Sequence, residues 1–212
     1  FGGYDGIYAG QAGGQVTEVA CWAHARRKFY DARHSDPAAG SHALAMIRLL
    51  YDVETQAKKT AHKTGEPLVA VRHRLRQQQS LGRLAEFNTW LTSQQAEHGG
   101  PILPKSPVGQ AVQYALNQWD ALSVYTTDGR LAIDNNAAEN ALRRVAIGRK
   151  NWLFAGSDKG GRTAATLFSL IATCARHNIE PTAYLADVLT RIADTPQSQL
   201  DNLLPDRWQP AD

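Results

Sequence analysis

The stretch VGQAVQYALNQWDAL, residues 108–122, decides the secondary-structure class of this chain. Its apolar residues recur at intervals of three and four, which places them on one face of an α-helix: Val108, Ala111, Val112, Ala115, Leu116, Trp119 and Leu122. The same spacing appears upstream, within residues 44–53 and again within residues 81–91. We therefore expect a mainly helical protein in which each helix buries one apolar stripe.

Glycine and proline divide this helical pattern into segments. A break at residues 65–67 interrupts the long upstream region, and GGPILPKSP at residues 99–107 ends it. Downstream of a turn at residues 127–129, apolar periodicity predicts helices at 163–177 and 181–193. The second of these has a proline, Pro181, at the first helical position, where its missing N–H costs nothing.

Two short segments indicate a small β component. Residues Val16 to Trp22 (VTEVACW) alternate between apolar and polar, which is the period of a half-exposed strand. Residues 151–155 (NWLFA) are apolar and lie between glycine turns, which favours a strand or an extended buried segment. The predicted class is therefore mainly α with a small β component (α+β).

The composition is typical of a globular protein with a hydrophobic core. Of 212 residues, 43% are hydrophobic and 20% are charged, which excludes a disordered, collagen-like or coiled-coil chain. No run approaches the ~18 consecutive apolar residues of a membrane span, and the first residues lack the pattern of a signal peptide. Cys21 and Cys174 are too far apart in sequence to indicate a disulfide framework. We expect a cytoplasmic protein with no membrane partner.

Basic residues are concentrated in runs, although the net charge is only +3. Residues 143–162 contain six basic side chains and one acidic one, residues 58–76 repeat that ratio, and Arg26, Arg27 and Lys28 form a third run. Such density suits a polyanion such as nucleic acid, because each neutralised phosphate releases counterions. The alternative, that each run is the solvated face of a helix, stays open.

The sharpest local pattern is IDNNAAEN, residues 133–140. Asn136 followed three residues later by Glu139 matches a capping box, in which each side chain satisfies a backbone N–H of the first helical turn. The competing interpretation is that Glu139 presents a carboxylate to a divalent cation such as Mg²⁺, which needs several such oxygens. These residues alone do not decide between the two.

Two weaker patterns also have an ordinary explanation beside a functional one. Cys21 with His24, and Cys174 with His177, would together supply four ligands to tetrahedral zinc. A thiol on an apolar helix face, however, is commonly an inert buried residue. The segment GSDKGGR, residues 156–162, has the glycines and lysine of a phosphate-binding loop without the P-loop spacing, and it fits a glycine turn before a helix equally well.

Four separated segments closely resemble the insertion-sequence-66 (IS66) family of bacterial transposases. In chain order they are CWAHARRKF (21–29), LPKSPVGQAVQYALNQWDAL (103–122), IDNNAAENALRRVAIGRKNWLFAGSDKGGRTAA (133–165) and AYLADVLTRIADTPQSQLDNLLPDRWQP (183–210). The last segment resembles the distinct C-terminal element of that family. The resemblance extends from Phe1 to about Pro210.

The resemblance implies a ribonuclease H-like fold and DDE transposition, in which two Asp and one Glu hold two Mg²⁺ ions. The family motif Asp-Asn-Asn-x-x-Glu-Arg places the Glu of this triad on Glu139, as catalytic residue and metal ligand. The implied partners are transposon-end and target DNA, with self-association and accessory proteins of the element as further expectations, in a bacterial, nucleoid-associated location. We assign the DNA contacts to the basic run that follows Glu139: Arg143, Arg149, Lys150, Lys159 and Arg162.

The chain departs from the complete family pattern in three places. FGGYD, residues 1–5, matches only the part of Thr-Asp-Gly-Tyr-x-Gly-Tyr that follows its Asp-Gly, so both catalytic Asp residues are expected upstream of Phe1. Asn140 replaces the usual Arg, and Arg144 stands where Pro is common. We therefore expect the C-terminal portion of a transposase, inactive alone and dependent on the upstream Asp residues to bind Mg²⁺.

The expected organisation has four parts. Residues 1–35 form a partial ribonuclease H-like core, residues 36–106 a helical insertion, residues 107–177 the rest of the catalytic core with the Glu139 helix, and residues 178–212 the C-terminal helical element. The helices from about Ser41 to Glu97 are expected to form a separate lobe. Two alternatives stay open: a catalytically inactive nucleic-acid-binding or self-associating helical module left by a truncated element, and a metal-free helical regulator. The sequence upstream of this chain would decide between the enzyme and the remnant.

Overall fold

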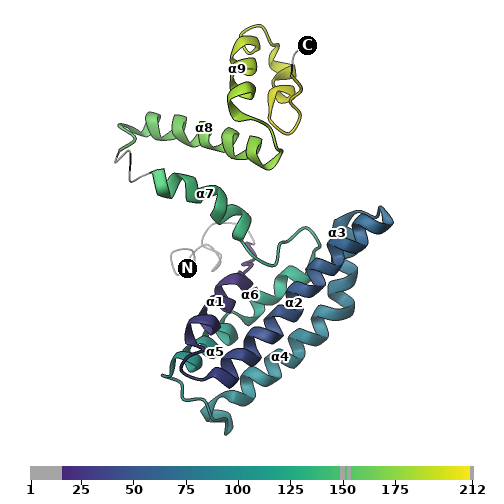
Figure 1. Cartoon of the computed structure of the whole chain (residues 1–212), viewed down its shortest axis with the longest axis vertical. Helices are drawn as coiled ribbons and strands as arrows, with labels where there is room; N and C mark the ends of the chain where they lie inside the picture. Colours follow the sequence, from purple (N-terminus) through teal and green to yellow (C-terminus); the bar gives the residue numbers. More distant parts are fainter. Residues whose placement is uncertain (1–15, 149–150, 152–153, 211–212) are drawn as a thin grey trace. The chain divides into compact units, whose positions relative to one another are not determined.

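The computed structural model describes residues 16–148, 151 and 154–210, and the chain divides into two compact units, Phe1–Asn136 and Ala137–Asp212 (Figure 1). Within the described residues, the secondary structure is helical apart from an isolated β-bridge between Gln95 and Ile102. The prediction of a mainly helical chain is confirmed, whereas the small β component is not.

The segment predicted as a strand, Val16 to Trp22, is not one. The N–H of Ala20 donates to the carbonyl of Ala121 (2.9 Å) and that of Trp22 to the carbonyl of Ile133 (3.1 Å), so these groups pair with a helix and a loop and not with a second strand. The apolar alternation does not mark a buried face either, because Val16 is exposed. Of the second predicted strand, Trp152 and Leu153 lie outside the described residues, and Phe154 is 84% exposed.

A long helical hairpin lies in the first unit (Figure 1). Gly65 connects its two arms with a φ of 75°, a left-handed conformation that glycine adopts without steric strain, which confirms the predicted break. One arm is a single helix and the other is a helix with a π-helical interruption: α2 (Pro37–Thr64), then α3 (Leu68–Leu75), η3 (Arg76–Ser80) and α4 (Leu81–Gln94).

Shorter helices complete the first unit by packing against the hairpin: α1 (Trp22–Ala32), η4 (Ala96–His98), α5 (Pro107–Asn117), α6 (Trp119–Ser123) and η5 (Val124–Thr127). Trp22 is fully buried in their common core, and its indole Nε1 donates to the carbonyl of Leu122 (2.8 Å). One cluster of buried side chains contains Trp22 and Phe29 together with Phe87 and Val112. The helices between residues 41 and 97 therefore share a core with the segments on both sides of them.

The turn after η5 approaches α3 closely at Gly129, and this contact yields a stability prediction. A Cβ at Gly129 would lie 1.9 Å from the carbonyl oxygen of Val69, whereas a Cβ at Gly82 meets nothing within 4 Å. We expect Gly129→Ala to destabilise the protein by about 1–3 kcal/mol through overpacking. Gly82→Ala, inside α4, should stabilise it by roughly 0.5–1 kcal/mol. Urea denaturation of both variants checks the pair, and shifts of the same sign would contradict the close approach.

In the described residues of the second unit, the chain forms α7 (Asn136–Gly148), whose first residue belongs to the first unit, followed by α8 (Asp158–Arg176), α9 (Pro181–Arg191) and η6 (Gln197–Leu203). Buried Tyr184 donates its hydroxyl to the carbonyl of Leu203 (2.7 Å) and meets the ring of Trp208 edge-on. Glu180 caps α9 by accepting the N–H of Ala183, and Pro181 begins that helix as predicted.

The glycine-rich segment GSDKGGR supplies the start of α8. The hydroxyl of Ser157 accepts the N–H of Gly160 (3.1 Å), so the helix begins at Asp158, five residues before the predicted start at Thr163. The segment therefore starts a helix, as this interpretation requires, but only Gly156 and Ser157 precede the helix, whereas Gly160 and Gly161 lie inside α8. Among the described helices, none is both long and apolar enough to cross a bilayer.

Candidate functional site

Glu139 lies in the first turn of α7, and its side chain is exposed. The helix begins at Asn136, whose N–H donates to the Asp134 carboxylate (3.2 Å). The predicted capping box requires Asn136 to be the residue just before the helix. In the structure Asn136 is the first residue of the helix, so the capping box is not formed as predicted. The acceptor at this helix start is Asp134, and the acidic Glu139 one turn on also suits the positive end of the helix dipole.

The described residues do not assemble a divalent-metal site by themselves. In this part of the chain, no group of three or more His, Cys, Asp or Glu side chains is arranged to hold an ion. Mg²⁺ takes about six oxygen ligands and is usually held by more than one carboxylate or by carboxylate and phosphate together. Glu139 alone therefore fits a single ligand position of such a site, and no reaction step follows from this chain alone.

Cys174, one of the four potential zinc ligands, lies inside the hydrophobic cluster of the second unit. It is fully buried together with Tyr184, Val188 and Leu203. Burial raises the pKa of the thiol, which keeps it protonated and disfavours metal binding. Cys174 is thus a small core residue, in agreement with its place on an apolar helix face.

The residues predicted to contact DNA occupy two helices. Arg143 is exposed on α7, one turn after Glu139, and residues four apart lie on the same side of a helix. Lys159 and Arg162 are exposed at the start of α8. Arg149 and Lys150 lie outside the described residues. DNA contact by these five residues stays a prediction.

The three arginines of the second basic run, residues 58–76, pair with carboxylates of the chain, whereas its three lysines are exposed. Arg76 is fully buried against Glu54, Arg72 also contacts Glu54 (3.3 Å), and Arg74 pairs with Glu66 (2.6 Å). These three arginines therefore neutralise carboxylates of the chain. The exposed Arg74 pair fits the solvated-face interpretation, whereas the buried Arg76 fits neither that interpretation nor nucleic-acid binding.

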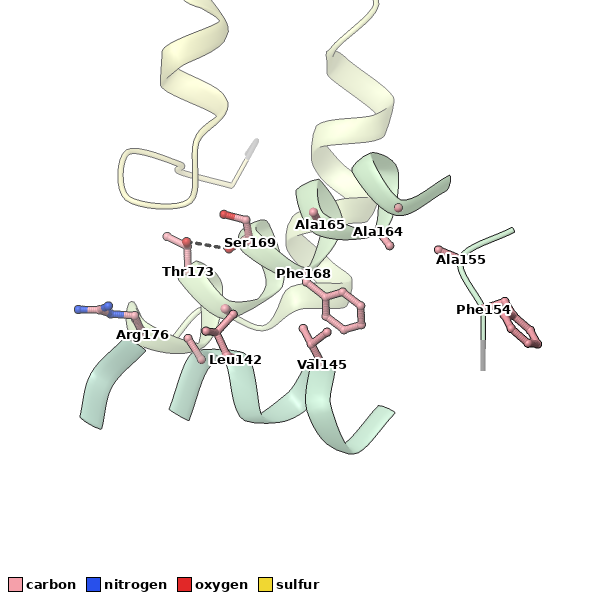
Figure 2. Close-up of a pocket in the computed structure, with 13 residues that line it drawn as sticks. Leu142, Val145, Phe154, Ala155, Ala164, Ala165, Phe168, Ser169, Thr173 and Arg176 are labelled. Carbon is pink, nitrogen blue, oxygen red and sulfur yellow. Dashed lines mark hydrogen bonds between the residues drawn. The ribbon is translucent and has the colours of Figure 1, made fainter. Parts of the chain in front are cut away.

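An apolar groove separates α7 from α8 within the second unit. Its volume is about 640 Å³, and Figure 2 shows Leu142 and Val145 of α7 opposite Phe168 of α8, with Arg176 toward one end. Leu142 is 66% exposed. The described residues of this unit thus leave an apolar face uncovered, and exposed apolar patches of this kind usually mark contact surfaces.

A second pocket, which includes two arginine side chains in its lining, lies between α1 and α2 in the first unit. Its volume is about 430 Å³, and it is lined by Ala23, Arg26, Leu44, Arg48, Tyr51 and Asn136. The lining follows from helix geometry: Leu44, Arg48 and Tyr51 are four and three residues apart on α2, and Ala23 and Arg26 are three apart on α1, so each set forms one stripe.

Asp134 adds a negative charge beside this pocket. Burial, together with the neighbouring Asp134 carboxylate, raises the pKa of Tyr51 far above its usual range, so the phenol stays neutral. The sequence analysis identified Arg26 only as part of a basic run and missed Arg48. No sequence signal identifies the pair, because their proximity depends on how α1 packs against α2.

Comparison with known proteins gives two family matches. Residues 1–163 match the family described as "Transposase IS66 family", and residues 169–205 match the "IS66 C-terminal element". No solved structure matches the chain significantly.

Three curated proteins of Sinorhizobium fredii (strain NBRC 101917 / NGR234) are similar to the chain, and each is named as uncharacterized. Protein y4hP is 37% identical over 209 residues, covering 92% of this chain and 36% of its own length. Protein y4qI is 39% identical over 200 residues, covering 92% and 34%, and y4jD is 32% identical over 191 residues, covering 89% and 35%. The chain thus spans about a third of the length of these relatives.

Proposed function

This chain belongs to the IS66 family of transposases, and from that membership we propose that it is the C-terminal part of a DNA transposase. Its role is to contribute the Glu139 carboxylate to a two-metal DDE active site whose two Asp residues lie upstream. The observation that carries the proposal is the family match over residues 1–163, which includes the motif around Glu139. The alternative is a catalytically inactive nucleic-acid-binding or self-associating module.

The position of Glu139 is consistent with this role. Two divalent ions bound by three carboxylates supply an activated attacking oxygen and a stabilised leaving oxygen for phosphoryl transfer. Glu139 is exposed on the first turn of α7, where ligands from outside this chain can approach its carboxylate. The helix fixes the direction of the Cα–Cβ bond of Glu139, and thus the side from which its carboxylate can reach an ion.

The apolar groove between α7 and α8 supports a larger catalytic core. In the proposed protein, the face that carries Leu142, Val145 and Phe168 packs against the ribonuclease H-like sheet formed by the upstream part. Burying a Leu or Phe side chain contributes about 1.5–3 kcal/mol, so this contact would hold the Glu139 helix firmly in place. Relatives about three times as long as this chain have room for such a sheet.

Extending the chain upstream tests the proposed function. A protein expressed from the native gene, with both predicted Asp residues restored, should cleave and join transposon-end DNA only when Mg²⁺ is present. The 212-residue chain should show no transfer under the same conditions, because it supplies one matched carboxylate. Strand-transfer assays on labelled transposon-end duplexes measure both. An extended protein that binds this DNA without transferring strands would favour the inactive module.

A further inference from the structure

We propose that the pocket between α1 and α2 binds a phosphodiester group of the DNA backbone, and that the guanidinium groups of Arg26 and Arg48 contact the phosphate. The inference rests on the proposed function, because it takes DNA as the polyanion. It adds a binding site in the first unit, apart from the basic run between residues 143 and 162.

Within the described residues no carboxylate pairs with either arginine, although the Arg26 guanidinium also lies 6.0 Å from the centre of the Tyr30 ring. Arg72, Arg74 and Arg76 of the neighbouring helices each contact a carboxylate. Neither Arg26 nor Arg48 forms an ion pair within the described part of the chain, and both are exposed. Two guanidinium groups lining one cavity without a carboxylate partner repel each other, and a bound anion removes that repulsion.

The remaining groups of the pocket match a phosphodiester. A guanidinium group donates two parallel hydrogen bonds that fit two phosphate oxygens. The Asn136 amide adds a further donor, and the neutral Tyr51 phenol adds no negative charge. A volume of about 430 Å³ falls in the ~300–1,000 Å³ range of ligand pockets, enough for a phosphodiester with parts of its two sugars.

The location also suits the proposed reaction. Asn136 lines the pocket and begins α7, and Glu139 follows three residues later in the same helix. At 1.5 Å per residue this is a rise of about 4.5 Å. The pocket residue Asn136 is therefore separated by only two residues in sequence from the proposed metal ligand.

Duplex binding by the 212-residue chain tests the pocket. Fluorescence anisotropy with a short fluorescein-labelled duplex should show Arg26→Ala/Arg48→Ala binding about tenfold more weakly, with a salt slope lower by about 1, as for the loss of one phosphate contact. Lys58→Ala/Lys59→Ala is the matched control, because it removes two exposed positive charges from α2 at a distance from the pocket in sequence. Equal weakening by both double variants would overturn the proposal.

The substitution Asp134→Asn should change the duplex affinity in the opposite direction. The substitution removes the negative charge beside the pocket and keeps a side-chain oxygen that can accept the Asn136 N–H. Duplex affinity should therefore rise by about threefold, in line with the loss of one repulsion between the half-buried Asp134 carboxylate and the phosphate. An unchanged or lower affinity would contradict an anion in this pocket.

Two further arms separate the alternatives. Inorganic phosphate should bind weakly in the same pocket. Its binding is measured by the NMR chemical shifts of the backbone amides of Arg26 and Arg48. If phosphate binds there but the Arg26→Ala/Arg48→Ala change leaves the duplex affinity unchanged, the pocket binds free phosphate and the DNA proposal is wrong. If only Arg149→Ala/Lys150→Ala weakens duplex binding, the DNA contact lies in the basic run predicted from sequence, and the pocket proposal is wrong. The proposed function is tested separately by strand transfer and is not affected by this outcome.

Discussion

Strand transfer by the upstream-extended protein is expected to fall by about a thousandfold or more when Glu139 is replaced by Gln. The substitution keeps the size and shape of the side chain but removes the charge that a divalent ion requires. Metal stabilisation of the transition state amounts to several kcal/mol, and each 1.36 kcal/mol corresponds to a tenfold change in rate. Losing a ligand therefore lowers the rate by orders of magnitude.

Thermal unfolding of the same variant should change little. The Glu139 side chain is exposed, so Gln leaves no cavity and buries no polar group. The carboxylate that accepts the first N–H of α7 belongs to Asp134, which is unchanged. A purely structural Glu139 would give the reverse pattern, with lower stability and near-normal transfer.

Glu86→Gln provides the matched control for this experiment. Glu86 is an exposed residue of α4, so the chemical change is the same in a helix with no proposed ligand. Its strand-transfer rate should equal that of the wild type. Transfer at the wild-type rate by Glu139→Gln as well would refute the assignment of Glu139 as a metal ligand.

The helices were predictable because each is determined by local periodicity and by its breaks. The apolar spacing of residues 108–122 predicted one helix, which the structure divides at Gln118 into α5 and α6. Gly65 with its left-handed φ separates α2 from α3 as expected. The prediction of a strand at Val16–Trp22 from local alternation was wrong. A strand needs a partner from elsewhere in the chain, and here the backbone of Ala20 and Trp22 pairs with other segments.

The candidate site was predictable only where one short motif carries it. Glu139 follows from the IDNNAAEN pattern and from the family resemblance, and it lies on the first turn of a helix as expected. The pocket of Arg26 and Arg48 was not predictable, since it joins two helices whose packing no local pattern specifies. Local sequence likewise suggested a basic surface at residues 58–76, where packing buries Arg76 instead.

Arg76 is also the residue whose replacement should destabilise the first unit most. Its guanidinium is fully buried and makes bonds of 2.7 and 2.8 Å to the two oxygens of Glu54. It also donates to the carbonyls of Tyr125 (2.6 Å) and Asp128 (2.9 Å). One side chain thus connects the helical hairpin to the turn that follows η5, and the π-helical segment η3 begins at this residue.

Arg76→Met is expected to cost about 3 kcal/mol of the free energy of unfolding. Met fills a similar volume, so the loss comes chiefly from leaving the Glu54 carboxylate buried with too few partners, for which about 3–5 kcal/mol is typical. The lower end applies because Arg72 remains 3.3 Å from Glu54. Urea denaturation measures the change, and hydrogen exchange should show protection lost in α2 and α4 but retained in α9.

A double-mutant cycle separates the ion pair from simple loss of packing. Adding Glu54→Leu to Arg76→Met removes the unpaired carboxylate, so the double variant should recover at least part of the lost stability. Arg74→Ala is the matched control, because Arg74 also makes two hydrogen bonds to one carboxylate, that of Glu66, but on the exposed surface, where solvent screens the pair. It should therefore leave the stability nearly unchanged. If Arg74→Ala destabilised the protein as much as Arg76→Met, or if Glu54→Leu worsened the Arg76 variant, burial of the charge would not be the cause.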